Sequence, residues 1–393
     1  MREGLLCRPA EEQDLPQIQA LWSQCFDDTP AFVQWYFQRY YQAQHTLGIF
    51  DGATLLASAQ MIPYTISLRE SCVPAAYIVG VDTAPKARNQ GCARTMLQEC
   101  PRTERLRGQS ISLLMPFEGQ FYYRYGWPFC YFHQQMMLEP QELRCAAAPW
   151  GAIRQVDAFA AIPELQRIYQ RFVQGYHGTV CRDLRQWQLL LEDAAMEHTL
   201  CFLLEQEGVA QGYCLWTPLK GKIFIREMAW CCAEAKAGLL YFLEQNVPAG
   251  QTLWLELPDD DDLVFQLAVS KKSVVRYPFL MARIVDVVQC LEAIHYPLQQ
   301  AQVDLAVTDT FAPWNQGVFR LQVREGRGHV QPQLPATEAA VLVTIEGLSQ
   351  LVFGVRSVAQ LIRQNMLHVC DTAVQELLEQ LWPVQNTYIN EYY

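Results

Sequence analysis

The residues best suited to chemistry form a basic, glycine-bearing segment near position 90, which reads Arg88-Asn89-Gln90-Gly91-Cys92-Ala93. An apolar run at residues 77–81 precedes it, and apolar positions at helical spacing follow it, so the order predicts a strand, a loop and a helix. The first backbone N–H groups of a helix have no partner inside the helix, and the helix dipole makes that end positive. The segment therefore suits the binding of a phosphate group.

The pattern within this segment, here called the phosphate loop, narrows the kind of phosphate site. A P-loop requires Gly-Lys-Ser/Thr and a dinucleotide-binding fold requires Gly-x-Gly-x-x-Gly, and the segment has neither. Gly91 leaves room for a pyrophosphate to approach the backbone, Ala93 keeps the next turn low, and Arg88 supplies positive charge. A surface turn that opens a helix has the same residue types, so the neighbouring elements have to decide between the two interpretations.

The elements that position the loop are predicted from their hydrophobic period. Residues 11–26 and 31–41 have helical patterns, and Asp14 is a candidate N-cap of the first helix. Strands are predicted over residues 46–50, 54–62, 64–68, 110–115 and 131–138. An aromatic motif separates the last two strands and reads Phe121-Tyr122-Tyr123-Arg124-Tyr125-Gly126-Trp127.

A fixed offset indicates that this pattern is repeated in the second third of the chain. Residues 15–22 align with residues 162–169, with Pro16 on Pro163, an offset of 163 − 16 = 147 positions. The same offset places the strand at residue 77 on a strand at residue 224. The second copy lacks the Arg-x-x-Gly-x-Ala pattern and has an acid, Glu234, in the equivalent loop. We therefore expect one phosphate ligand per chain.

The last third of the chain has a different pattern. Helices and strands alternate from about residue 284, with strands at 301–307, 317–323 and 339–345 and helices at 348–353, 357–363 and 371–381, which predicts a small α+β layer. The C-terminal tail, residues 382–393, contains four aromatic side chains. Since chain ends are usually polar and frayed, we expect this aromatic tail to be docked.

Composition excludes several classes of protein. No apolar run reaches the roughly 20 residues of a membrane span, and the first residues do not form a signal peptide, so we expect a soluble cytoplasmic protein. The 14 cysteines and 7 histidines lack metal-ligand spacing, so we expect no metal. A net charge of −11 argues against nucleic acid as a partner and mildly favours cationic substrates.

These patterns together resemble the enhanced-intracellular-survival (Eis) type of GNAT N-acetyltransferase. The resemblance rests on the phosphate loop, the aromatic motif at 121–127, the segment Ala282-Arg-Ile-Val-Asp286 and the aromatic tail. It implies an α/β (α+β) fold class, with tandem GNAT (acyl-CoA N-acyltransferase) folds followed by a sterol carrier protein-like domain. The implied domains are a catalytic GNAT domain at 1–145, a degenerate GNAT domain at 146–283 and the sterol carrier protein-like domain at 284–393.

The resemblance also implies roles for individual residues. Tyr122 is expected to be the general acid and the terminal carboxylate of Tyr393 the general base. Acetyl-CoA is the expected co-substrate, and a small-molecule or peptide amine is the expected acceptor. The residues expected to bind acetyl-CoA are Val79, Val81, Thr83, Arg88, Asn89, Gln90, Gly91, Cys92 and Ala93. The family also suggests a homo-oligomer.

Some expectations leave alternatives open. Trp22, Phe26, Trp35 and Tyr36 could line an amine pocket through cation–π contacts, or could belong to the core of the first domain. Phe117 departs from the family, because a small polar residue there would be able to contact coenzyme A. A lipid- or sterol-binding protein, or a scaffold that binds coenzyme A without catalysis, remains an alternative function.

Overall fold

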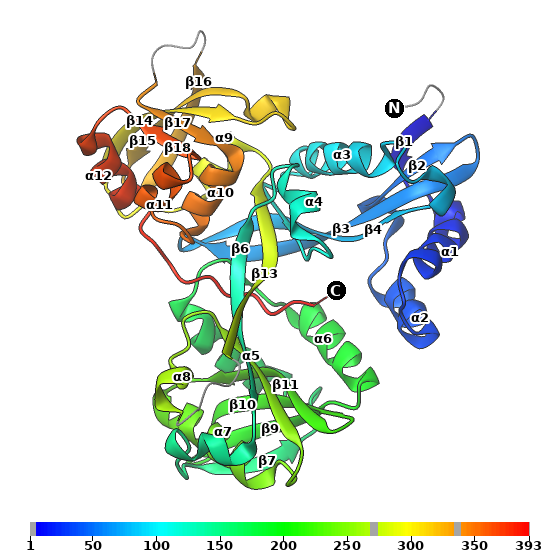
Figure 1. The fold of residues 1–393 in the computed structure, drawn as a ribbon, viewed down its shortest axis with the longest axis vertical. Helices are drawn as coiled ribbons and strands as arrows, with labels where there is room; N and C mark the ends of the chain where they lie inside the picture. The colour runs from blue at the N-terminus through cyan, green and yellow to red at the C-terminus, as the bar shows by residue number, and fades with distance from the viewer. Residues whose placement is uncertain (1–4, 268–273, 334–338, 393) are drawn as a thin grey trace.

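The computed structural model describes residues 5–267, 274–333 and 339–392. It has three lobes, and the C-terminal tail runs between them (Figure 1). Twelve successive strands of one sheet join the first two lobes, and a five-stranded sheet forms the third lobe.

The first copy of the repeated pattern contains two helices, a strand meander and the helix that follows the phosphate loop. Its elements are β1 (Leu5–Pro9), α1 (Leu15–Cys25), α2 (Pro30–Arg39), β2 (Thr46–Asp51), β3 (Thr54–Leu68), β4 (Ser71–Thr83), α3 (Cys92–Leu106), β5 (Ile111–Leu114), α4 (Gly119–Tyr123) and β6 (Phe129–Leu138).

The second copy repeats this order. Its elements are β7 (Ala152–Val156), α5 (Ile162–Phe172), β8 (Thr179–Val180), α6 (Leu184–Met196), β9 (Leu200–Gln206), β10 (Val209–Leu219), β11 (Lys222–Trp230), α7 (Ala233–Asn246), β12 (Thr252–Pro258), α8 (Leu263–Gln266) and β13 (Val274–Ile284). The offset of 147 holds at both ends of the first long helix, since 162 − 15 = 147 and 172 − 25 = 147. It also holds at the end of β4, since 230 − 83 = 147.

The two copies exchange their last strands. The sheet order is β1-β2-β3-β4-β5-β13-β6-β12-β11-β10-β9-β7, with β8 paired to β3 off this path. β13 of the second copy therefore pairs with β5 of the first, and β6 of the first copy pairs with β12 of the second. As a result, each half of the sheet is completed by a strand from the other copy, and Figure 1 shows β6 and β13 crossing between the lobes.

The third lobe is built as an α+β layer. Its elements are α9 (Val287–Ala293), β14 (Gln300–Thr308), β15 (Gly317–Arg324), β16 (Arg327–Gln333), β17 (Val341–Thr344), α10 (Ile345–Phe353), α11 (Val358–Arg363), β18 (Leu367–Val369) and α12 (Thr372–Leu381). The sheet order is β16-β15-β14-β17-β18. One buried apolar cluster runs from the first lobe through β13 into the third, whereas the second lobe has two clusters of its own.

Two details of the strands differ from the sequence prediction. The strands predicted at 54–62 and 64–68 are one strand, β3. Because β2 begins at Thr46, opposite Gln60, Pro63 lies beyond the pairing with β2 and interrupts no hydrogen bond to it. The third lobe also contains β16 and β18, which the sequence analysis did not predict. β16 is rich in polar residues, and β18 has three residues, so neither has a clear period.

Candidate active site

A gap between β4 and β5 forms the centre of the site. The two strands are parallel, and their pairing ends at Ile78 opposite Leu114. Beyond that point the residues 79–81 of β4 and 115–117 after β5 line one cavity of about 460 Å³. The strands therefore diverge here, and their facing backbone groups are released from the sheet. We call this space the aromatic cavity.

A bulge in β4 shapes the wall of the aromatic cavity. Ser58 of β3 pairs with Asp82, but Gln60 pairs with Val79, so two residues of β4 lie opposite one residue of β3. Gly80 is one of the two and has a φ of +61°. A Cβ on Gly80 would lie 2.3 Å from the ring of Trp22, so only glycine allows this ring to pack on the bulge.

Aromatic side chains of the first two helices close the cavity on one side. Trp22 and Phe26 at the end of α1 and Tyr36 of α2 all line it, and Trp22 and Tyr36 also belong to the buried core of the first lobe. The rings of Trp22 and Tyr36 stack with centroids 4.7 Å apart. Asp28 also lines the cavity and accepts a hydrogen bond of 2.8 Å from Trp22 Nε1.

Trp35 does not line the aromatic cavity. Its Nε1 donates a hydrogen bond of 2.9 Å to Glu192 on α6, and its side chain lines a small neighbouring pocket together with Tyr392. Successive residues of a helix point about 100° apart, so Tyr36 can face the cavity while Trp35 faces the second lobe. Trp35 is therefore a contact between lobes in this structure.

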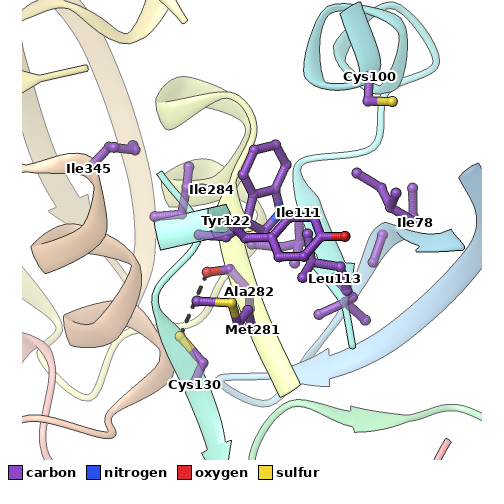
Figure 2. Close-up of a cluster of buried hydrophobic side chains, with 14 of the residues drawn as sticks. Ile78, Cys100, Ile111, Leu113, Tyr122, Cys130, Met281, Ala282, Ile284 and Ile345 are labelled. Atoms are coloured by element: carbon purple, nitrogen blue, oxygen red, sulfur yellow. Dashed lines mark hydrogen bonds between the residues drawn. The ribbon is translucent and has the colours of Figure 1, made fainter. Parts of the chain in front are cut away.

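Tyr122 lies at the bottom of the aromatic cavity. It lies near the C-terminal end of α4, and Glu118 caps the N-terminal end of this helix by accepting the N–H groups of Gln120 and Phe121. The side chain is 4% exposed and packs against Ile111 and Leu113 of β5 (Figure 2). Burial raises the pKa of the Tyr122 phenol above its ordinary value, so the hydroxyl keeps its proton at neutral pH.

Phe117 lies at the mouth of the cavity. Its ring is 79% exposed and sits edge-on to Tyr122, with ring centroids 5.7 Å apart. The resemblance to the Eis type implies a small polar residue at this position. The structure places a large apolar side chain beside the tyrosine instead.

The phosphate loop lies beyond the C-terminal end of β4. Gly91 has a φ of +86° and is the N-cap of α3, and a Cβ there would point into space not filled by any described residue. Arg88 is exposed, and its Nε donates to the carbonyl of Thr83 at 3.4 Å. The N–H groups of the first turn of α3 have no earlier helical carbonyl to bond, so they point out of this end. These residues fit a pyrophosphate, which needs donors, positive charge and close backbone approach.

The C-terminal tail is docked, as its aromatic residues predicted. Thr387 donates to the carbonyl of Cys130, and the carbonyl of Ile389 lies 2.8 Å from His133 Nε2. Residues 387–391 are buried. The hydroxyl of Tyr77, which lines the aromatic cavity, bonds the carbonyl of Glu391. Tyr393 itself lies outside the described residues.

A buried ion network from the second copy holds the tail. Arg182 makes two hydrogen bonds of 2.7–2.8 Å with Glu227 and a third of 2.8 Å with Glu391. Asn390 also donates to Glu227 at 3.0 Å. Because Arg182, Glu227 and Glu391 are all buried, these pairs fix the tail in one place. Tyr77, Arg182 and Glu227 were not predicted from the sequence as residues that bind the tail. They lie far from the tail along the chain, and no sequence pattern links them to it.

A larger cavity of about 680 Å³ lies elsewhere, between α5 and β3. It is lined by Ser67, Gln166, Tyr169 and Arg182 among others, and contains neither the strand gap nor the aromatic motif. We place the candidate active site in the aromatic cavity because the strand gap, the bulge and Tyr122 meet there.

Within residues 5–267, 274–333 and 339–392, no helix is both long and apolar enough to cross a bilayer. The same residues contain no group of three or more His, Cys, Asp or Glu side chains placed to hold a metal ion.

Two parts of the chain match known protein families. Residues 7–130 match the family model for an acetyltransferase (GNAT) domain, and residues 287–390 match a sterol carrier protein domain. A relative described as an uncharacterized N-acetyltransferase from Streptomyces avermitilis is 24% identical over 316 residues, which is 73% of this chain and 74% of the relative.

Solved structures share the whole fold. A probable N-acyltransferase from Enterococcus faecalis has a TM-score of 0.90 and 21% identity, with 99% of both chains covered. Eis1 from Mycobacterium abscessus has a TM-score of 0.78 and 19% identity, with 99% of this chain and 100% of that chain covered. The chain carries a GNAT acetyltransferase domain and a C-terminal sterol carrier protein domain, while its likeness to the Eis type is a likeness of fold.

Proposed function

We propose that this protein transfers an acetyl group from acetyl-CoA to a primary amine in the aromatic cavity. The observation that carries the proposal is the buried Tyr122 at the end of the gap between β4 and β5. Acetyl-CoA lies in this gap, with its pyrophosphate at the phosphate loop and its pantetheine arm beside Val79 and Val81. The amine enters beside Trp22, Phe26 and Tyr36, whose ring faces attract a cation.

The chemistry requires a base before the attack and an acid after it. An alkyl amine with a pKa near 10.4 is almost wholly protonated at neutral pH, so a base must remove a proton before nitrogen attacks the thioester. The new C–N bond forms through a tetrahedral oxyanion, and backbone N–H groups of the β4 bulge at residues 79–81 stabilise it. When the C–S bond breaks, Tyr122 donates its proton to the coenzyme A thiolate.

Tyr122 suits the role of acid for a specific reason. Its phenol is raised in pKa by burial, so the hydroxyl is protonated at neutral pH and can donate to the sulfur. As the C–S bond breaks, this proton passes to the sulfur, and the proton that the new amide nitrogen loses restores the phenol. The terminal carboxylate at position 393 takes the role of base, and the docking of residues 387–391 against the first lobe supports this assignment.

An acceptor panel tests the proposal. Purified protein with acetyl-CoA is incubated with a polyamine, an aminoglycoside, a lysine-bearing peptide and an arylamine, and free thiol and acetylated product are both measured. We expect thiol release that depends on the amine and matches the acetylated product. Binding of acetyl-CoA without transfer to any of the four acceptor classes would favour a coenzyme A-binding scaffold instead.

A further inference from the structure

The segment Ala282-Arg-Ile-Val-Asp286 joins the aromatic motif to the third lobe. Arg283 lies on β13, the strand that the second copy supplies to the sheet of the first, and it is 0% exposed. Its Nη1 donates to the backbone carbonyl of Tyr125, and its Nη2 pairs with the carboxylate of Asp309. One guanidinium therefore bonds the turn that follows Tyr122 and a side chain of the sterol carrier protein domain.

The turn after Tyr122 is built to receive this guanidinium. Gly126 has a φ of +94°, and a Cβ there would lie 2.1 Å from Arg283 Nη1. Any side chain at Gly126 would displace the guanidinium. The N–H of Tyr125 in turn donates to the carbonyl of Tyr122 at 2.9 Å. A continuous path of hydrogen bonds thus runs from Asp309 through Arg283 and Tyr125 to the backbone of Tyr122.

Asp309 is itself held rigidly in the third lobe. Its Oδ1 accepts the N–H groups of Phe311 and Ala312 at 3.0 and 2.9 Å, and its Oδ2 also accepts from Asn315 Nδ2 at 3.1 Å. The ring of Phe311 packs on the ring of Tyr125, with centroids 4.7 Å apart. The third lobe therefore contacts the turn after Tyr122 through both a buried ion pair and a ring.

We propose that the sterol carrier protein domain serves as a support for the acid of the first lobe, with Arg283 and Asp309 as positioning residues for Tyr122. This inference rests on the proposed role of Tyr122. It assigns the third lobe a part in acetyl transfer that does not require a lipid ligand. It also explains why Gly126 and Arg283 occur in the same chain, since the glycine makes room for the arginine.

A double-mutant cycle tests the proposal. Asp309→Asn keeps the size and the Oδ1 acceptor but removes the charge that orients Arg283, and turnover should fall roughly 10- to 100-fold, because a misplacement of about 1 Å costs about 10²-fold. The KM for acetyl-CoA should stay the same. In the Tyr122→Phe background the same substitution should cost almost nothing, because the hydroxyl that it positions is already absent.

Two further variants keep the test decisive. Asp304→Asn breaks an Arg–Asp pair with Arg320 inside the same lobe and should leave turnover unchanged. Phe311→Leu removes the ring contact without touching charge, so it can replace Asp309→Asn if that variant does not fold. The fall in turnover that Phe311→Leu causes should likewise disappear in the Tyr122→Phe background.

The cycle also separates this inference from the proposed function. If Tyr122→Phe keeps full activity, the proposed acid is wrong whatever the third lobe does. If Tyr122→Phe is impaired but Asp309→Asn, or Phe311→Leu in its place, lowers turnover by the same factor in both backgrounds, the third lobe acts through stability alone and the inference is overturned.

Discussion

The hydroxyl of Tyr77 donates a hydrogen bond of 3.1 Å to the backbone carbonyl of Glu391, a residue 314 positions further along the chain. Tyr77 lines the aromatic cavity together with Tyr122, and Glu391 is two residues before position 393. The C-terminal tail thus reaches the wall of the cavity in which we place acetyl transfer. This contact holds the tail beside the proposed site.

Adding residues after Tyr393 should depress turnover strongly. The extension moves the terminal carboxylate away without changing any side chain, so thermal stability and acetyl-CoA affinity should change little. A tag of the same length placed before residue 1 is the matched control. Equal rates of acetylation by the two tagged proteins would rule out a terminal base, and Glu118 would then be the next candidate.

Replacing Arg182 by methionine should destabilise the fold. Glu227 and Glu391 would remain buried without their partner, and breaking a buried pair in this way costs about 3–5 kcal/mol of unfolding free energy. Denaturant unfolding measures the change. Arg320→Met removes a partly exposed pair with Asp304 and should cost less than about 1 kcal/mol. Similar costs for both variants would show that the Arg182 network does not hold the tail.

Gly91→Glu should abolish the binding of coenzyme A. The side chain would enter the space beside the first turn of α3 and bring a negative charge to the place where we put the pyrophosphate. Gly52→Glu is the matched control, because Gly52 also has a positive φ and open space at its Cβ but lies in the β2–β3 hairpin. Calorimetric titration with coenzyme A should show binding in the control only. Unchanged affinity in Gly91→Glu would mean that the phosphate binds elsewhere.

Asp82 should make stability depend on pH. Burial raises its pKa from 3.8 to about 7, although Ser58 donates to it through N–H and hydroxyl. The folded state therefore holds a proton that the unfolded state releases, so this stabilisation is present below pH 4 and is lost as pH rises to about 7.

Asp82→Asn should remove this dependence. At pH 8 the variant should be more stable than the parent by about 1–4 kcal/mol, since each pKa unit is worth about 1.4 kcal/mol. At pH 4 the two should unfold at nearly the same temperature. If the unfolding free energies of parent and variant instead differ by the same amount from pH 4 to pH 8, Asp82 is ionised in the folded protein throughout this range.

The sequence predicted the local elements and the motif residues, because these depend on short-range patterns. The strand, loop and helix around the phosphate loop and the repeat at offset 147 both belong to this class. The exchange of β6 and β13 could not be predicted, because either strand has the same apolar pattern whichever copy it pairs with. The residues that hold the tail were also missed, since a buried Arg182 has no neighbour in sequence that indicates its distant partners.

The aromatic residues of α2 also show that sequence does not reveal which distant element a side chain faces. Trp35 and Tyr36 are adjacent in sequence and equal in aromatic character, yet only Tyr36 lines the cavity. Which face of α2 points to the cavity depends on the packing of α6 against it. The aromatic composition of α2 therefore indicated that its side chains could line a pocket. Tertiary packing determined which of these side chains does so.

The turnover of Tyr122→Phe tests the central claim most directly. The substitution removes one hydroxyl from a buried ring and leaves the gap between β4 and β5 intact. We predict that kcat falls by roughly 10²–10⁴-fold, the usual effect of losing a general acid, while acetyl-CoA affinity and thermal stability stay close to those of the parent. A variant that acetylates amines at the parent rate would contradict the account and move the acid to another residue.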